Sequence, residues 1–129
     1  MERGYSLVTE FREPMLRISD LETEDLPFIQ ADQEGLVEWI NARFEEVYGW
    51  QLAELQGQSL GLILPSFFRD AHHLGFSRFR MTGDSQVLNH PLKLKTVCRD
   101  QREIESEHFI VAERRGERWV FAATLRPLE

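Results

Sequence analysis

The pattern of hydrophobic and polar positions divides the chain into two groups of predicted β-strands with helices between them. Residues 28–32 and 36–40 are short apolar runs around a polar four-residue turn, in which Gly35 supplies conformational freedom. Three further runs near the C-terminus alternate with a period of two, and polar turns at 99–102 and 114–117 separate them. The positions expected on one face of these strands are Leu92, Leu94, Thr96 and Cys98; Ile104, Ser106, His108 and Ile110; and Trp119, Phe121, Ala123 and Leu125.

Apolar positions between the two strand groups recur at helical spacing. A helix is predicted directly after Asn41, whose side-chain oxygen can accept from the free amides at a helix N-terminus, and Gly49 is expected to end it as a left-handed cap. A longer helix opens at Pro65 and Ser66 and runs to about Met81. Two strands, a helical middle and three strands predict an α+β fold, a five-stranded antiparallel sheet with short helices on one face.

Residues 1–24 are expected to form an amphipathic N-terminal extension before a domain at 25–129. Apolar residues lie there at near-helical spacing, at Val8, Phe11, Met15 and Ile18. An amphipathic helix has to bury its apolar stripe. Two partners stay open for this stripe, the domain's own sheet and a second copy of the chain.

Composition narrows the class of protein. A chain of 129 residues that is 42% hydrophobic can bury one sizeable core. Its net charge of -7 disfavours nucleic acid and anionic membrane surfaces as partners. The single cysteine, Cys98, excludes an intrachain disulfide, and no apolar run is long enough for a signal peptide or a membrane span. The expected location is cytoplasmic.

The order of short motifs in the first half of the chain carries a family resemblance. The motifs are Asp32-Gln33-Glu34-Gly35, Asn41-Ala42-Arg43-Phe44, Tyr48-Gly49-Trp50, Glu54-Leu55-Gln56-Gly57 and Leu62-Ile63-Leu64-Pro65. This order resembles the first half of PAS domains, in which an I-x-x-D-x-x-G strand pair precedes N-x-x-F, a G-Y-like step and E-L-x-G. The resemblance covers residues 26–128 and implies the PAS fold.

The same resemblance implies a function. PAS domains are sensory modules that bind a small ligand or a partner and relay a conformational change to an effector such as a kinase or cyclase. It also implies a homodimer and no catalysis by the domain itself, and residues 119–125 would form the output strand.

The predicted helix after Pro65 is also similar to the helix of haem-binding PAS domains in oxygen-sensing kinases. In that family a histidine at the place of His72 binds the iron, and an arginine at the place of Arg78 lies near a haem propionate. Haem is therefore one candidate cofactor, and His72 would be a metal ligand only if haem is bound. Leu92 stands where those sensors use a distal arginine, so bound oxygen would lack that donor. The alternative is that a backbone carbonyl satisfies His72 while Arg78 snorkels at a helix end.

Strand alternation assigns Ser106 and His108 to the face that points inward. Convergent donors in an apolar cavity suit a small anionic or polar ligand. The predicted pocket is lined by His72, Phe76, Arg78, Phe79, Leu92, Ser106, His108, Ile110 and Phe121. A one-residue change of register would instead turn Phe109 and Val111 inward and leave His108 in solvent.

The sequence gives less support to two other hypotheses, flavin binding and enzymatic catalysis. Flavin is disfavoured, because Cys98 lies at a strand end and no N-C-R-F-like motif occurs near Pro65. The rival class is a small isomerase or hydrolase on a cone-shaped α+β fold, with His72 or His108 as base and a nearby carboxylate to orient it. Such folds usually place long helices before their sheet, whereas here the hairpin at 28–40 comes first.

Overall fold

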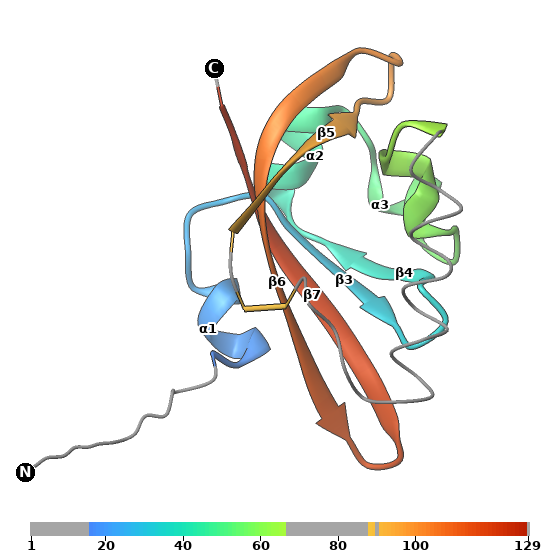
Figure 1. Cartoon of the computed structure of the whole chain (residues 1–129). Helices are drawn as coiled ribbons and strands as arrows, with labels where there is room; N and C mark the ends of the chain where they lie inside the picture. Colours follow the sequence, from blue (N-terminus) through green and yellow to red (C-terminus); the bar gives the residue numbers. More distant parts are fainter. Residues whose placement is uncertain (1–15, 67–87, 90, 129) are drawn as a thin grey trace, which may run out of the picture.

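The computed structural model describes residues 16–66, 88–89 and 91–128, which form one five-stranded antiparallel sheet with short helices (Figure 1). The strand order is β4-β3-β7-β6-β5. The elements are α1 (Ile18–Glu22), β3 (Phe28–Asp32), β4 (Val37–Ile40), α2 (Ala42–Tyr48), α3 (Leu52–Leu55), the 3-10 helix η1 (Leu60–Ile63), β5 (Pro91–Val97), β6 (Glu103–Arg115) and β7 (Arg118–Pro127). The predicted α+β class and the five antiparallel strands are confirmed. Apart from Ser66, the predicted helix from Ser66 to Met81 lies outside the described residues.

The first and last strands of the sheet along the chain, β3 and β7, pair with each other. Phe28 lies opposite Thr124 and Asp32 lies opposite Val120, so β7 sits between β3 and β6. The β6–β7 hairpin is longer than predicted, because Arg115 still pairs with Arg118. Gly116 has a φ of +64°, which allows the connection to be tighter than the predicted turn at 114–117.

Helices α2, α3 and η1 contribute to one core, on what we call the inner face of the sheet. Phe44 and Tyr48 are four residues apart in α2, so both rings lie on the same side of the helix, and their centroids are 4.9 Å apart. This core contains Ile29, Val37, Ile40, Phe44, Tyr48, Trp50, Leu55, Ile63, Leu64, Cys98, Ala123 and Leu125. The predicted gathering of helices over one face is therefore confirmed for these elements.

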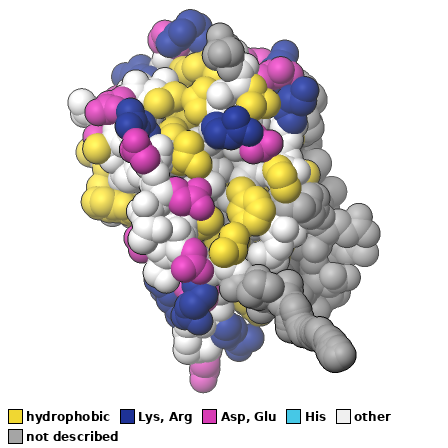
Figure 2. All heavy atoms as spheres, turned by 90° about the vertical axis from the view of Figure 1, so that its left-hand side faces the viewer, with side chains coloured by type: hydrophobic (Ala, Val, Ile, Leu, Met, Phe, Trp, Pro, Cys, Tyr) yellow, Lys and Arg dark blue, Asp and Glu magenta, His cyan; other side chains and the backbone are white. Residues whose placement is uncertain are grey.

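Helix α1 covers the opposite, outer face, over β6 and β7 (Figure 1). Its Ile18 and Leu21 are buried in a second core with Phe28, Val111, Val120 and Ala122. Of the predicted apolar stripe, Ile18 therefore packs on the sheet of its own chain, whereas Val8, Phe11 and Met15 lie outside the described residues. Figure 2 views this side of the molecule, where apolar side chains lie among acidic and basic ones.

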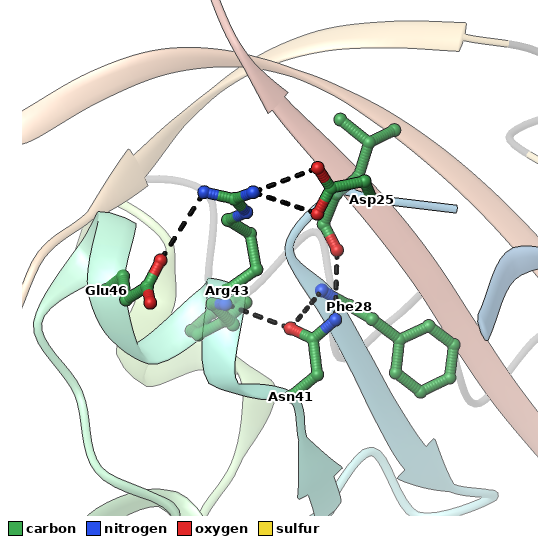
Figure 3. Close-up of polar contacts among 7 residues, drawn as sticks. Asp25, Phe28, Asn41, Arg43 and Glu46 are labelled. Carbon is green, nitrogen blue, oxygen red and sulfur yellow. Dashed lines mark hydrogen bonds and ion pairs between the residues drawn. The ribbon is translucent and has the colours of Figure 1, made fainter. Parts of the chain in front are cut away.

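Asn41 joins α2 to the start of β3 (Figure 3). Its side-chain oxygen accepts from the backbone N–H of Phe44 at 2.9 Å, as predicted for a helix cap, and from that of Phe28 at 3.0 Å. Its amide nitrogen donates to the carbonyl of Leu26 at 3.0 Å. Gly49 ends the helix with a φ of +84°, so the predicted left-handed cap is confirmed.

None of the helices that the described residues form has the length and apolar character needed to cross a membrane.

We expect Asn41→Ala to lower the free energy of unfolding by about 2 kcal/mol, because it removes a helix cap and leaves a partly buried N–H without its acceptor. Urea unfolding followed by circular dichroism measures this loss. Arg43→Ala in the same helix is the matched control: the ion pair of Arg43 with Asp25 is exposed, so stability should hardly change. Equal effects of the two substitutions would contradict the proposed role of Asn41.

A buried polar cluster as the candidate functional site

Four polar side chains lie together on the inner face of the sheet, and we call them the polar cluster. They are Tyr48 of α2, Thr96 of β5, and Ser106 and His108 of β6. Their exposed fractions are 1%, 0%, 0% and 4% respectively. The hydroxyl of Tyr48 lies 2.6 Å from that of Ser106, and the Thr96 hydroxyl lies 3.0 Å from Nε2 of His108. The cluster therefore links one helix and two strands by hydrogen bonds away from bulk water.

Burial controls the charge of His108. It disfavours the imidazolium and lowers the pKa of His108 from its ordinary 6.5 to about 4. At neutral pH the ring is uncharged, with one nitrogen that donates and one that accepts. Within the described part of the chain, its side-chain hydrogen bond is the one to Thr96.

Tyr48 is also uncharged at neutral pH. Burial raises the pKa of Tyr48 above its ordinary value, while hydrogen bonds to Ser106 and Thr96 act in the opposite direction. The cluster consequently presents hydroxyl and imidazole groups without formal charge.

Apolar side chains of β5 face the cluster across the strand pair. Leu92 lies opposite His108 and Leu94 lies opposite Ser106, and both leucines are half-buried. Residues directly opposite in an antiparallel pair share one face of the sheet. The cluster is thus bordered by apolar surface that is not fully covered.

The structure places five of the nine predicted pocket residues. Ser106 and His108 are buried on the inner face, not turned to solvent as the alternative register required, and Phe109 and Val111 contribute to the outer core. Leu92 is adjacent to His108, and Ile110 packs against the inner core. Phe121 is buried farther along β7, opposite Ala112. His72, Phe76, Arg78 and Phe79 lie outside the described residues, and their roles stay predictions.

Sequence reasoning missed Tyr48 and Thr96 as site residues. Both occupy positions in periodic patterns, Tyr48 in a helical one and Thr96 in a strand one, and periodicity alone does not distinguish a packing residue from a site residue. The available signal was chemical: a buried tyrosine or threonine needs a partner for its hydroxyl.

The thiol of Cys98 and the carboxylates of β6 are not part of the polar cluster. Cys98 is buried at the end of β5, and burial raises the pKa of its thiol. In the described ranges, no three His, Cys, Asp or Glu side chains gather where they could hold a metal ion. Glu105 and Glu107 lie directly opposite Lys95 and Lys93 in the β5–β6 pair.

The topology and the helix-covered inner face give the chain the fold of PAS domains, as its motifs predicted. No protein-family model matches the sequence. The chain is 31% identical over 77 residues to sensor protein FixL of Bradyrhizobium diazoefficiens. That match covers 60% of this chain but only 15% of the length of FixL.

Solved PAS domains share the fold. The PAS domain of an HTR-like protein from Haloarcula marismortui is 18% identical with a TM-score of 0.68, over 86% of this chain and 88% of that one. The PAS domain of the quorum-sensing receptor RpfR from Cronobacter turicensis, in complex with C12:0, is 15% identical with a TM-score of 0.61. That match covers 82% of this chain and 96% of the RpfR chain.

The depressed pKa of His108 makes stability dependent on pH. Between pH 4 and pH 6.5 the unfolded chain binds a proton that the folded protein does not, so stability falls as the pH falls through this window. We expect His108 to contribute a loss of up to about 3 kcal/mol. Urea unfolding of the wild type and of His108→Gln at several pH values isolates the effect. Parallel stability curves for the two proteins would show that His108 is not responsible.

Proposed function

We propose that this chain is a PAS sensory module that binds a small polar ligand on the inner face of its sheet. The observation that carries the proposal is the polar cluster, in which hydrogen-bonding groups are buried next to the half-covered Leu92 and Leu94. Ligand sites commonly combine an apolar lining with a few convergent polar groups that fix orientation.

The relatives support a sensory role. FixL is a sensor protein, and the RpfR domain is a receptor domain with C12:0 bound. Because the chain corresponds to a small part of FixL, the link to an effector such as a kinase or cyclase is part of the proposal. Assembly as a homodimer and a cytoplasmic location belong to it as well.

The signal would pass through the strands that carry the cluster. A ligand shifts a conformational equilibrium only when it binds the two arrangements unequally. Hydrogen bonds join Tyr48 of α2 to Ser106 of β6, and Thr96 of β5 to His108 of β6. A ligand that forms a hydrogen bond with the cluster would favour the arrangement of α2, β5 and β6 in which these groups are held in place. Strand β7 lies next to β6 and would carry the change onward.

We favour a sensor over the cone-shaped enzyme. A histidine base in such an enzyme needs a carboxylate to orient it. Here the imidazole of His108 is hydrogen-bonded to the hydroxyl of Thr96. A hydroxyl does not stabilise an imidazolium as a carboxylate does, and burial already disfavours the charged ring.

Native mass spectrometry of freshly purified protein tests ligand binding and subunit number together. We expect dimers that carry a bound small molecule, and less of it in His108→Leu than in the control Thr124→Val, which changes a buried residue on the outer face. Subunits without bound mass in every preparation, whose melting temperature is also unchanged by C12:0, 1-octanol or haem, would contradict the proposal.

Visible absorption tests the haem alternative separately. Haem held by His72 is expected to give a band near 400 nm, roughly where such haems absorb, and His72→Ala should remove it. A colourless protein that haem does not stabilise would exclude this cofactor and leave other ligands open.

A further inference from the structure

One nitrogen of His108 is buried without a partner in the described part of the chain. The side chain is 4% exposed, and its Nε2 lies 3.0 Å from the hydroxyl of Thr96. Among the described residues, none forms a hydrogen bond to Nδ1 of the ring. A buried polar atom left unpaired is costly, so native proteins usually provide it with a partner. A bound molecule would supply one.

The residues around His108 indicate the chemical character of the rest of the bound molecule. Leu92 lies directly opposite His108 in the strand pair, and Leu94 lies opposite Ser106. Both leucines are only half-buried although they share the inner face with the polar cluster. Apolar surface beside a polar atom suits a ligand with an apolar body and a single polar group.

The polar group of the ligand should be uncharged. The buried polar residues in the described part of the chain are Thr96, Ser106, His108 and Thr124, and none of them carries a charge when His108 is neutral. A carboxylate buried beside these groups would lack a counter-charge and would lose its hydration. A hydroxyl avoids that cost. Because it can both donate and accept, it pairs with Nδ1 in either tautomer of the ring.

We propose that Nδ1 of His108 binds an uncharged hydroxyl group of a small ligand whose apolar part lies against Leu92 and Leu94. Thr96 is then a positioning residue: its bond to Nε2 fixes the orientation of the ring and leaves Nδ1 available. The inference rests on the proposed function and deepens it, because it names the chemical class of the ligand.

A matched pair of probes tests the class of ligand. 1-Octanol and octanoate have the same chain length, but at pH 7 only octanoate is charged. Nitrogen NMR of the imidazole side chains, with the His108 signals assigned by their absence in His108→Gln, reports on the ring directly. We expect 1-octanol to shift the Nδ1 signal of His108 and to bind at least about tenfold more tightly than octanoate, a difference of roughly 1.4 kcal/mol.

Substitutions at two buried threonines test the role of Thr96. Thr96→Val removes the hydroxyl next to His108, whereas Thr124→Val makes the same change on β7, away from the polar cluster. We expect about tenfold weaker binding of 1-octanol in Thr96→Val, and unchanged binding in Thr124→Val. Thr96→Ser keeps the hydroxyl and should restore both the binding and the His108 spectrum, which a purely structural role in packing would not predict.

The outcomes separate this inference from the proposed function. Tighter binding of octanoate would overturn the uncharged class while ligand binding itself stands. If neither probe shifts the His108 signals but native mass spectrometry detects a bound molecule, the sensory module stands and the assignment to Nδ1 fails. If no probe binds and no bound mass is found, both are overturned.

Discussion

The pairing of β3 with β7 is the contact on which the rest of the structure depends. It joins the sheet's first strand along the chain to its last one. The segment between them forms a long loop, and the entropy cost of closing such a loop grows only slowly with its length. Its register places Ala123 toward the inner core and Ala122 toward the outer one. A slip by one residue would exchange these faces, and the helices on each side would lose their packing surfaces together.

Local signals in the sequence were sufficient for much of the fold. The cap at Asn41 and the left-handed Gly49 involve contacts within a few residues, so residue type and spacing predict them. Alternation also identified all three C-terminal strands. It did not show that the apolar residues of their second face, such as Val111, belong to a core under α1, because both faces of β6 are partly apolar and the partner comes from the distant N-terminal segment.

The site was less accessible to such reasoning. Ser106 and His108 could be selected because they are polar residues in the inward phase of a strand. Tyr48 could not, because its partner Ser106 is 58 residues away in the sequence, and only the tertiary fold brings the two hydroxyls together. Thr96 likewise requires the register of β5 against β6. The periodicity of a single sequence does not show which residues far apart in the chain come into contact.

Stability alone gives no reason for a polar cluster at this place. Replacing both members of a buried hydrogen-bonded pair by apolar groups of the same shape can be nearly neutral, so these two hydrogen-bonded pairs add little stability beyond that of good apolar packing. These hydrogen bonds instead specify the relative positions of the elements that they join. Tyr48 ties α2 to β6 at one point, and His108 ties β5 to β6 at another, so each bond specifies the position of one element relative to the same strand. A molecule that forms a hydrogen bond with the cluster depends on the placement that these bonds fix, so its affinity can differ between two arrangements of the sheet.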